Sequence, residues 1–381
     1  MARPTPLIPP PCSDIPLGDG RQLLIGAQLG RGSMATVYRG VYEGACGLRR
    51  AVAVKVYDTI ASDEHDAVLS ALTMAAQRGA CVRHPNVVRV EDFGLAGPAQ
   101  PYSVVELVEG RSLAKLLASF ARRRERIPPD VALFIGSEIA EALAGARLAS
   151  TPEGMRVGVV HGDLSPCDVL LSWHGEVKVS DFEVAIAARA ASTVRSVRAL
   201  ARRVSFLAPE VARGQVGDAR SDVFSLGVIL REMLVGPRFP SFVTEQQALG
   251  WAREGIVHTS IFEPQLPSAV QCIVARALEK DPANRYPHAG ALGYELRRVA
   301  LAMGVGDGRS FLRSALARVF AEDSEEEPTG ELQLQTPVPR PSGVVDRFAR
   351  LRGEIDPESG TLPIAGDACE DDDPDGKAHG S

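Results

Sequence analysis

Residues 161–171 read His-Gly-Asp-Leu-Ser-Pro-Cys-Asp-Val-Leu-Leu, and residues 178–183 read Lys-Val-Ser-Asp-Phe-Glu. The two segments place three carboxylates, Asp163, Asp168 and Asp181, on loops beside short strands of β-branched residues and leucine. Phosphoryl transfer needs such a cluster, because one acid must orient a hydroxyl group while others hold Mg²⁺ against phosphate oxygens. Lone aspartates in loops are often turn caps, but three at these spacings favour the chemical interpretation.

A glycine-rich segment and a strand lysine precede this cluster. Residues 29–38 contain Gly30 and Gly32, where backbone N–H groups could approach phosphates without interference from a Cβ atom. Paired glycines alone usually mark a hairpin turn, but residues 52–55 follow with Val-Ala-Val-Lys. In that context Lys55 is predicted to bind phosphate, rather than to be a solvated lysine at the edge of a strand.

These motifs resemble those of the protein kinase family, whose catalytic loop reads H-R-D-L-x-x-x-N and whose metal-binding loop reads D-F-G. Further landmarks follow in the family's order: His84-Pro85-Asn86, Ala208-Pro209-Glu210, Asp222 in a predicted helix, and Arg285. The resemblance covers residues 23–300 and is greatest to bacterial Ser/Thr kinases of the Hanks type. It implies a two-lobed α+β fold with a small β-rich lobe containing one main helix, a larger helical lobe, and an ion pair between Glu210 and Arg285.

The resemblance also implies roles for the residues of the cleft between the lobes. Asp163 would accept or orient the proton of the substrate hydroxyl, and Lys55 would clamp the phosphates of ATP. Asp168 and Asp181 would hold Mg²⁺ or Mn²⁺, and Val105 would lie at the back of the adenine pocket. The residues expected around the nucleotide are Leu29, Gly30, Gly32, Val37, Ala53, Lys55, Glu106, Val108 and Leu170.

Five positions depart from the family pattern. No acid occurs between Asp66 and Glu91, although a helix in this region should present a glutamate to Lys55. Glu64 or Asp66 could substitute from an earlier turn. The other four departures replace the loop arginine, the lysine that contacts the transferred phosphate, the metal-binding asparagine and the glycine of D-F-G: they are Gly162, Ser165, Asp168 and Glu183.

The segment between Glu183 and Glu210 contains several arginines and no acid: Arg189, Arg195, Arg198, Arg202 and Arg203. One interpretation is a flexible, solvated loop. The alternative hypothesis is that the segment folds over the carboxylate cluster and neutralises it when ATP is absent.

Hydrophobic periodicity predicts a β-rich part followed by a mostly helical part. Strands are expected near residues 37–41, 52–56, 87–92, 102–108, 169–172 and 177–180. Helices are expected over residues 63–82, 112–124, 129–149, 219–234 and 268–278. The chain is therefore divided into a Pro-rich disordered segment (1–20), a small lobe (21–109), a large lobe (110–320) and an acidic disordered tail (321–381).

The composition, 45% hydrophobic and 24% charged over 381 residues, is typical of a globular protein. Residues 322–381 hold 16 acids and 5 bases, so the preceding part carries +5 of the net charge of −6. This distribution argues against a nucleic-acid binder and suits an anionic ligand. The six scattered cysteines, the lack of a signal peptide and the lack of an apolar run of roughly 18–20 residues predict a cytoplasmic protein without a membrane partner.

We therefore predict a serine/threonine protein kinase homologue that binds MgATP and, if active, transfers the γ-phosphate to a protein hydroxyl. One alternative is a pseudokinase that acts as a signalling scaffold, favoured by the missing helix glutamate and the altered metal-site asparagine. Another is a small-molecule phosphotransferase, because H-G-D and D-F-E also resemble spellings in kinases that phosphorylate aminoglycosides or choline. The expected partners are ATP and a protein substrate or signalling partner.

Overall fold

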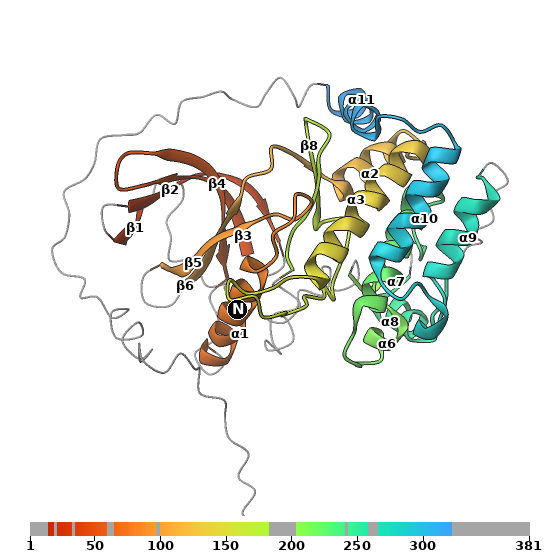
Figure 1. Cartoon of the computed structure of the whole chain (residues 1–381), viewed down its shortest axis with the longest axis horizontal. Helices are drawn as coiled ribbons and strands as arrows, with labels where there is room; N and C mark the ends of the chain where they lie inside the picture. Colours follow the sequence, from red (N-terminus) through yellow and green to blue (C-terminus); the bar gives the residue numbers. More distant parts are fainter. Residues whose placement is uncertain are drawn as a thin grey trace, which may run out of the picture. The chain divides into compact units, whose positions relative to one another are not determined.

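The computed structural model of the chain describes residues 14–18, 21–32, 35–58, 65–96, 100–182, 203–240, 243–257 and 266–321. Along the chain, a β-rich lobe is followed by a mostly helical lobe (Figure 1). This is the two-lobed α+β architecture predicted from the sequence. The acidic tail and most of the Pro-rich segment lie outside the described residues.

The small lobe is built on an antiparallel sheet of six strands in the order β1-β2-β3-β4-β6-β5. The strands are β1 (Asp14–Gly18), β2 (Arg21–Arg31), β3 (Ala35–Glu43), β4 (Arg49–Tyr57), β5 (Val90–Ala96) and β6 (Gln100–Glu106). Every neighbouring pair of strands is joined by a backbone ladder.

Strand β4 shows how this sheet separates its core from its site. Val52, Val54 and Val56 are buried in an apolar cluster on one face of the sheet. Because successive side chains of a strand point to opposite faces, Ala53 and Lys55 lie on the other face. Lys55 is therefore a buried polar residue of a central strand, and this contradicts the interpretation as a solvated edge lysine.

Strand β1 differs from the prediction that residues 1–20 are disordered. Ile15 pairs with Leu23 of β2 and shares its apolar cluster. Leu17 packs against the same cluster. The alternating apolar residues of this short stretch therefore add an edge strand, a signal that the surrounding prolines obscure.

The main helix of the small lobe, α1 (His65–Ala80), falls within the predicted range 63–82. It lies beside β5 and buries Val68 and Leu72 in a cluster with Tyr57 at the end of β4. The helix is thus fixed to the sheet by apolar contacts along one face.

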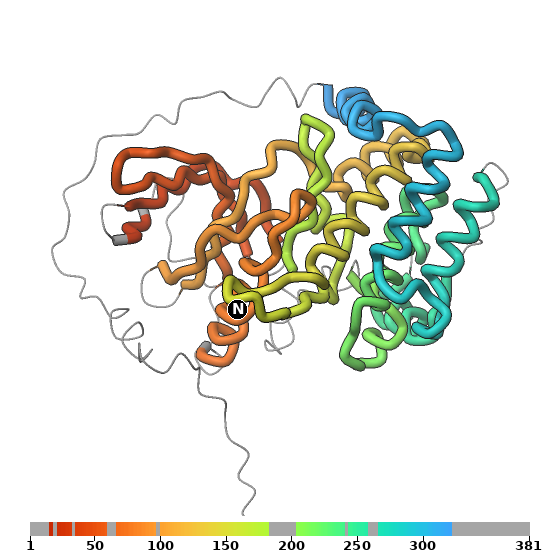
Figure 2. Tube along the Cα trace, viewed as in Figure 1, coloured from red at the N-terminus to blue at the C-terminus, as the bar shows by residue number. Residues whose placement is uncertain are grey.

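In the described part of the chain, the large lobe contains eight complete α-helices and one 3-10 helix, η1 (Pro282–Asn284). The α-helices are α2 (Leu113–Arg122), α3 (Pro129–Arg147), α6 (Pro209–Ala212), α7 (Ala219–Leu234), α8 (Glu245–Glu254), α9 (Ser268–Ala277), α10 (Ala289–Ala302) and α11 (Gly308–Phe320). The tube in Figure 2 follows them from yellow to blue. No described helix has both the length and the hydropathy needed to cross a membrane.

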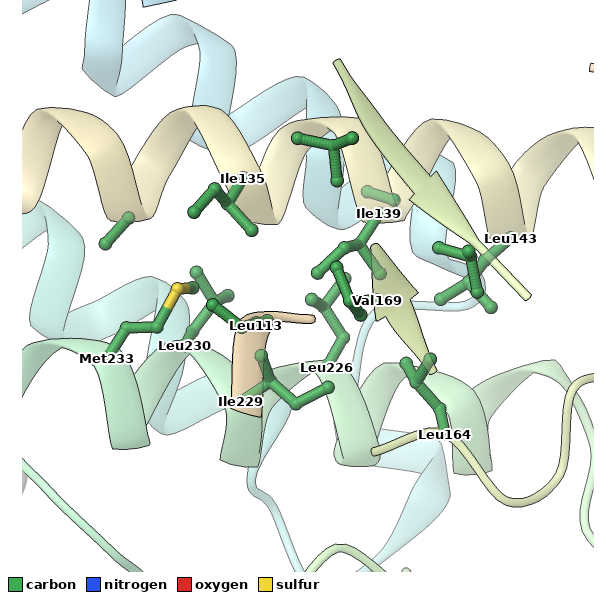
Figure 3. Packing of buried hydrophobic residues seen from close by; sticks show 14 of the residues in the cluster. Leu113, Ile135, Ile139, Leu143, Leu164, Val169, Leu226, Ile229, Leu230 and Met233 are labelled. Atoms are coloured by element: carbon green, nitrogen blue, oxygen red, sulfur yellow. The ribbon is translucent and has the colours of Figure 1, made fainter. Parts of the chain in front are cut away.

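The core of the large lobe lies between α3 and α7 (Figure 3). Ile135 and Ile139 of α3 face Leu226 and Leu230 of α7, and all four side chains are fully buried. Each buried aliphatic side chain of this kind contributes about 1.5–3 kcal/mol. Val169, beside Ile139 in the same view, connects this core to the segment that carries the predicted catalytic residues.

That segment forms a second sheet of three short strands, β7 (Gly110–Ser112), β8 (Val169–Ser172) and β9 (Val177–Val179). A Cβ atom on Gly110 would lie 1.9 Å from the Leu171 carbonyl oxygen, so only glycine permits β7 to pair this closely with β8. Val169, Val177 and Val179 are fully buried. The loops before β8 and after β9 therefore start from a rigid, anchored hairpin.

Candidate functional site

An apolar cluster lies on the site-facing side of the small-lobe sheet. Its buried members are Ala53, Val88 and Val105, and the partly buried residues that pack on it are Val37, Val90, Leu107, Val108 and Leu170. Ala53 is opposite Val105 in the β4–β6 register. The cluster combines residues of both lobes and brings together Val37, Ala53, Val108 and Leu170, which the sequence predicted to surround the nucleotide.

The glycine-rich hairpin contributes differently from the prediction. Leu29 is 44% exposed and is not a member of the apolar cluster. A Cβ atom on Gly30 would meet nothing within 4 Å, and one on Gly32 would meet only the Ala35 carbonyl oxygen at 3.4 Å. Packing in this structure does not require these glycines. The Gly32 N–H donates to the Ala35 carbonyl at 2.8 Å, so the interpretation of these glycines as an ordinary hairpin turn also still applies.

The connection between the lobes leaves the sheet after Glu106. The Glu106 N–H donates to the Arg89 carbonyl at 2.9 Å, and the Glu106 carboxylate pairs with Lys178 at 2.9 Å. Residues 107–109 lie between β6 and β7, outside both sheets. Backbone groups of Val108 are thereby placed next to the apolar cluster without belonging to a strand ladder.

Lys55 and Asp181 meet beside the apolar cluster, next to Val88 and Val105. The Lys55 ammonium donates to Oδ1 of Asp181, and both side chains are largely shielded from solvent. Asp181 has a φ of +68°, in the left-handed region that non-glycine residues seldom adopt. Residues before and after it fix this conformation: the Ser180 N–H donates to the Asp168 carbonyl at 2.8 Å, and the Phe182 ring lies 4.8 Å from the His161 ring.

His161 is a buried, neutral organiser of the two loops. Burial lowers the pKa of His161 to about 4, so the imidazole is uncharged at neutral pH. Its Nε2 lies 2.9 Å from the Ser180 carbonyl oxygen, which can only accept, so Nε2 carries the proton. Within the described residues, the buried Nδ1 has no hydrogen-bond partner. His161 therefore ties the catalytic loop to the loop that holds Asp181.

Asp222 of α7 holds the backbone of the loop at residues 161–168, and the sequence analysis gave Asp222 no role in the site. Its carboxylate accepts from the N–H groups of His161 at 2.9 Å and Gly162 at 2.8 Å. Burial raises the pKa of Asp222 to about 6, even though the two N–H groups favour the carboxylate form. The signal that could have revealed this role is an acid in the first turn of a helix whose sequence is otherwise that of a buried core helix.

Asp168 is turned toward its own loop. Its Oδ2 accepts from the Ser165 N–H at 2.9 Å and from the Ser165 hydroxyl at 2.8 Å. Burial raises the pKa of Asp168 to about 6. The described residues include no group of three or more His, Cys, Asp or Glu side chains arranged to hold a metal ion. Asp168 and Asp181 carry oxygen donors of the kind that Mg²⁺ prefers, and a metal ion there would need further ligands, such as nucleotide phosphates.

Asp163 is paired with an arginine from the segment before α6. Nη1 of Arg203 donates to Oδ2 of Asp163, and the side chains remain 26% and 18% exposed. The other four arginines of the Arg-rich segment, and Glu183, lie outside the described residues. For Arg203 alone, the structure has the contact with the carboxylate cluster that the folding-over hypothesis requires.

Comparison with known sequences identifies the family. The protein kinase domain pattern matches residues 24–294. The chain belongs to the protein kinase domain family. It is 36% identical over 278 residues to Serine/threonine-protein kinase PksC of Streptomyces coelicolor. The aligned region covers 71% of this chain and 48% of that protein. It is 32% identical over 282 residues to Serine/threonine-protein kinase PknL of Mycobacterium tuberculosis, covering 73% and 65%.

A third relative, Tyrosine-protein kinase MasK of Myxococcus xanthus, is 30% identical over 298 residues, covering 78% of this chain and 46% of that protein. The chain thus spans roughly half to two thirds of the length of these curated relatives. As predicted, it is a homologue of bacterial Hanks-type serine/threonine kinases.

The kinase landmark pair between Glu210 and Arg285 is confirmed. Arg285 donates from Nη1 and Nη2 to the two carboxylate oxygens at 2.7 and 2.8 Å, and the Ser221 hydroxyl donates to Oε1 at 2.7 Å. Burial alone would raise the pKa of Glu210, but the hydrogen bonds from Arg285 and Ser221 outweigh it and lower the pKa.

The kinase domain has a small cavity beside Val105, lined also by Lys55, Gly79 and Asp181. Gly79 is therefore the residue through which α1 reaches the cavity. Asp66 is at the opposite end of α1, about 20 Å away at 1.5 Å per residue. Asp66 therefore cannot take the place of the missing glutamate beside Lys55, and Glu64 lies outside the described residues.

Proposed function

We propose that this kinase domain binds MgATP between its lobes and transfers the γ-phosphate to serine or threonine hydroxyls of a protein. The observation that supports the proposal is the Lys55–Asp181 pair beside the apolar cluster, with Asp163 two residues after His161, whose ring contacts the Ser180 carbonyl next to Asp181. A cation and carboxylates beside a pocket for a flat base form the minimum set for binding a nucleotide and aiming its terminal phosphate.

Each residue has a role that follows from its position. Adenine would pack between Ala53 and Leu170, and Lys55 would bind phosphate oxygens with its ammonium group. Asp168 and Asp181 would hold Mg²⁺, which neutralises charge on the phosphates when bound. Asp163 would accept the proton of the substrate hydroxyl as its oxygen bonds to the γ-phosphorus and the bond from phosphorus to the bridging oxygen of ADP breaks.

One observation favours a second candidate, a nucleotide-binding signalling scaffold without phosphotransfer. The residue that α1 brings to the cavity beside Lys55 is Gly79, and no acid follows in α1 after Asp66. No carboxylate of α1 replaces the missing glutamate, and Lys55 pairs with Asp181, which must then serve both the lysine and the metal. For either candidate we propose a cytoplasmic location and a protein partner, in line with the composition of the chain.

Labelled ATP distinguishes the two candidates. The full chain is incubated with labelled ATP, Mg²⁺ or Mn²⁺, and dephosphorylated casein, beside the Asp163→Asn variant. We expect label on serine or threonine, with a rate roughly 10²–10⁴-fold lower in the variant because the general base is lost. A rise in Tm with MgATP but no transfer would select the scaffold. Transfer unaffected by the substitution, or no nucleotide-dependent shift, would contradict the proposed site.

A further inference from the structure

The catalytic loop lacks the cation that the family places next to the transferred phosphate. Ser165 stands at that position, and both its N–H and its hydroxyl are directed at Asp168. Residues 161–168 contain no lysine or arginine, and the one histidine among them is buried and neutral. The loop itself therefore offers no positive charge to a γ-phosphate.

Arg203 brings a positive charge to the same place from a different part of the chain. Its guanidinium contacts Asp163, the residue that would receive the substrate proton. The turn that carries Arg203 is held firmly: Arg238 donates to the carbonyls of Ser205 at 3.1 Å and Leu207 at 3.0 Å. These hydrogen bonds hold the backbone from which the Arg203 side chain extends toward Asp163.

The form of the contact leaves both partners available for chemistry. Arg203 touches only Oδ2 of Asp163, and within the described residues Oδ1 has no hydrogen-bond partner. An arginine carries five N–H donors in a planar fork, so a contact through one of them leaves others for a phosphate oxygen. A guanidinium that served only to block Asp163 would be expected to engage both carboxylate oxygens.

We propose that Arg203 supplies the positive charge for the transferred phosphate in place of the missing lysine at position 165. In this arrangement Lys55 and Arg203 flank the phosphate chain from two sides, each beside a carboxylate of the site. The guanidinium would bridge Oδ2 of Asp163 and a γ-phosphate oxygen, which aligns the base with the phosphorus it serves. This inference rests on the proposed function of the site.

Nucleotide affinity tests the inference without requiring activity. Dissociation constants for MgATP and MgADP are measured by calorimetry on the full chain and on Arg203→Ala, Arg203→Gln and Arg203→Lys. We expect Arg203→Ala and Arg203→Gln to weaken MgATP binding about tenfold, because a charge-assisted contact to the γ-phosphate is lost. MgADP binding should stay within about twofold, since ADP lacks that phosphate. Arg203→Lys should keep most of the preference for ATP, because one N–H contact does not require a fork.

Phosphotransfer gives the second measurement. With labelled ATP and casein, Arg203→Ala should lower kcat roughly 10²-fold, the typical cost of removing one donor that stabilises charge in the transition state. Arg213→Ala is the matched control, because Arg213 is an exposed arginine directly after α6 that contacts the backbone carbonyl of Arg253. We expect this variant to match the original chain in both assays. Values of Tm for all variants show whether the fold is kept. If Arg203→Ala does not fold, Arg203→Gln carries the test.

The outcomes separate this inference from the proposed function. A chain that binds neither nucleotide overturns both. A chain that binds and transfers phosphate, with the same ATP preference and kcat after Arg203→Gln, overturns only the role of Arg203. A higher kcat after Arg203→Ala would also overturn it, because the arginine would then be a block on Asp163. Loss of ATP preference with retained ADP binding supports it.

Discussion

Two arginine–carboxylate pairs in the large lobe have the same chemistry but differ in burial and in the number of hydrogen bonds that join them. Arg285 binds Glu210 through both terminal nitrogens, with side-chain exposures of 0% and 10%. Arg203 binds Asp163 through one nitrogen, with exposures of 26% and 18%. In the first pair, the N–H donors of the arginine and both carboxylate oxygens are hydrogen-bonded within the protein. In the second pair, some of these donors and acceptors have no partner among the described residues.

The difference indicates which pair is fixed within the fold and which pair has donors and acceptors left for a ligand. Arg285 also donates to the carbonyls of Glu279, Lys280 and Arg220, so it joins the turn after α9 to α6 and α7. Such a saturated fork cannot change partners without breaking the fold. A pair joined through one nitrogen, with both side chains partly exposed, can exchange part of its contact for a ligand at lower cost.

The largest effect is expected from breaking the saturated pair. Arg285→Ala leaves a buried Glu210 carboxylate without its charge partner, so we expect the free energy of unfolding to fall by about 3–5 kcal/mol. Urea denaturation measures it. Arg298→Ala, in an exposed pair with Glu295, is the control and should cost less than about 0.5 kcal/mol. A loss below about 1 kcal/mol in Arg285→Ala would show that the pair is not an anchor.

Asp222 extends the comparison, because it is a buried carboxylate that accepts from backbone N–H groups instead of from an arginine. Asp222→Asn replaces one of the two oxygens that accept from His161 and Gly162, so we expect a loss of about 1–3 kcal/mol at pH 7.5. The folded-state pKa of Asp222, about 6, lies above the unfolded value of 3.8, so the original chain gains stability from this group as the pH falls. The difference between the two proteins should therefore widen by about 1 kcal/mol between pH 7.5 and 5.0.

Asp218→Asn provides the matched control for this titration. Asp218 caps α7, and hydrogen bonding to Arg220 lowers its pKa below 3.8. Its contribution to stability is lost only as the pH falls below that value, so the Asp218→Asn difference should stay constant between pH 7.5 and 5.0. A constant difference for Asp222→Asn as well would show that burial does not govern the Asp222 carboxylate.

The smallest effect on stability is expected at the pair of Arg203 with Asp163. Arg203→Ala should change the free energy of unfolding by less than about 1 kcal/mol, because partly exposed ion pairs contribute little. A double-mutant cycle with Asp163→Asn in urea measures the coupling of the pair. A coupling as large as that between Arg285 and Glu210 would remove the distinction on which this comparison depends.

Much of the fold could be predicted from the sequence because its signals are local. Residues 219–234 form α7 as predicted, since Asp218 and Ser221 make a capping box before a long apolar helix. The strand expected at 87–92 instead begins at Val90. Val87 and Val88 have the apolar character of a strand, but they are held by backbone contacts to Val179 of β9.

The site was predictable only in part, for a related reason. Lys55 and Asp181 belong to short motifs whose spacing is visible in the chain. Arg203 is one of five arginines in its segment, and no local pattern distinguishes the one that meets Asp163 across forty positions. The same holds for Ser165, whose hydroxyl orientation depends on the burial of Asp168.

The cavity beside Val105 has a practical consequence for chemical inhibition. Its walls combine Gly79, Val87, Val88 and Val90 with the charged side chains of Lys55 and Asp181, and its free space is about that of one water molecule. On the proposed function, an adenine-like compound could extend only a single small group past Val105. Kinases with a bulkier residue in place of Val105 would reject the same substituent by steric clash, so the cavity is a basis for selective ligands.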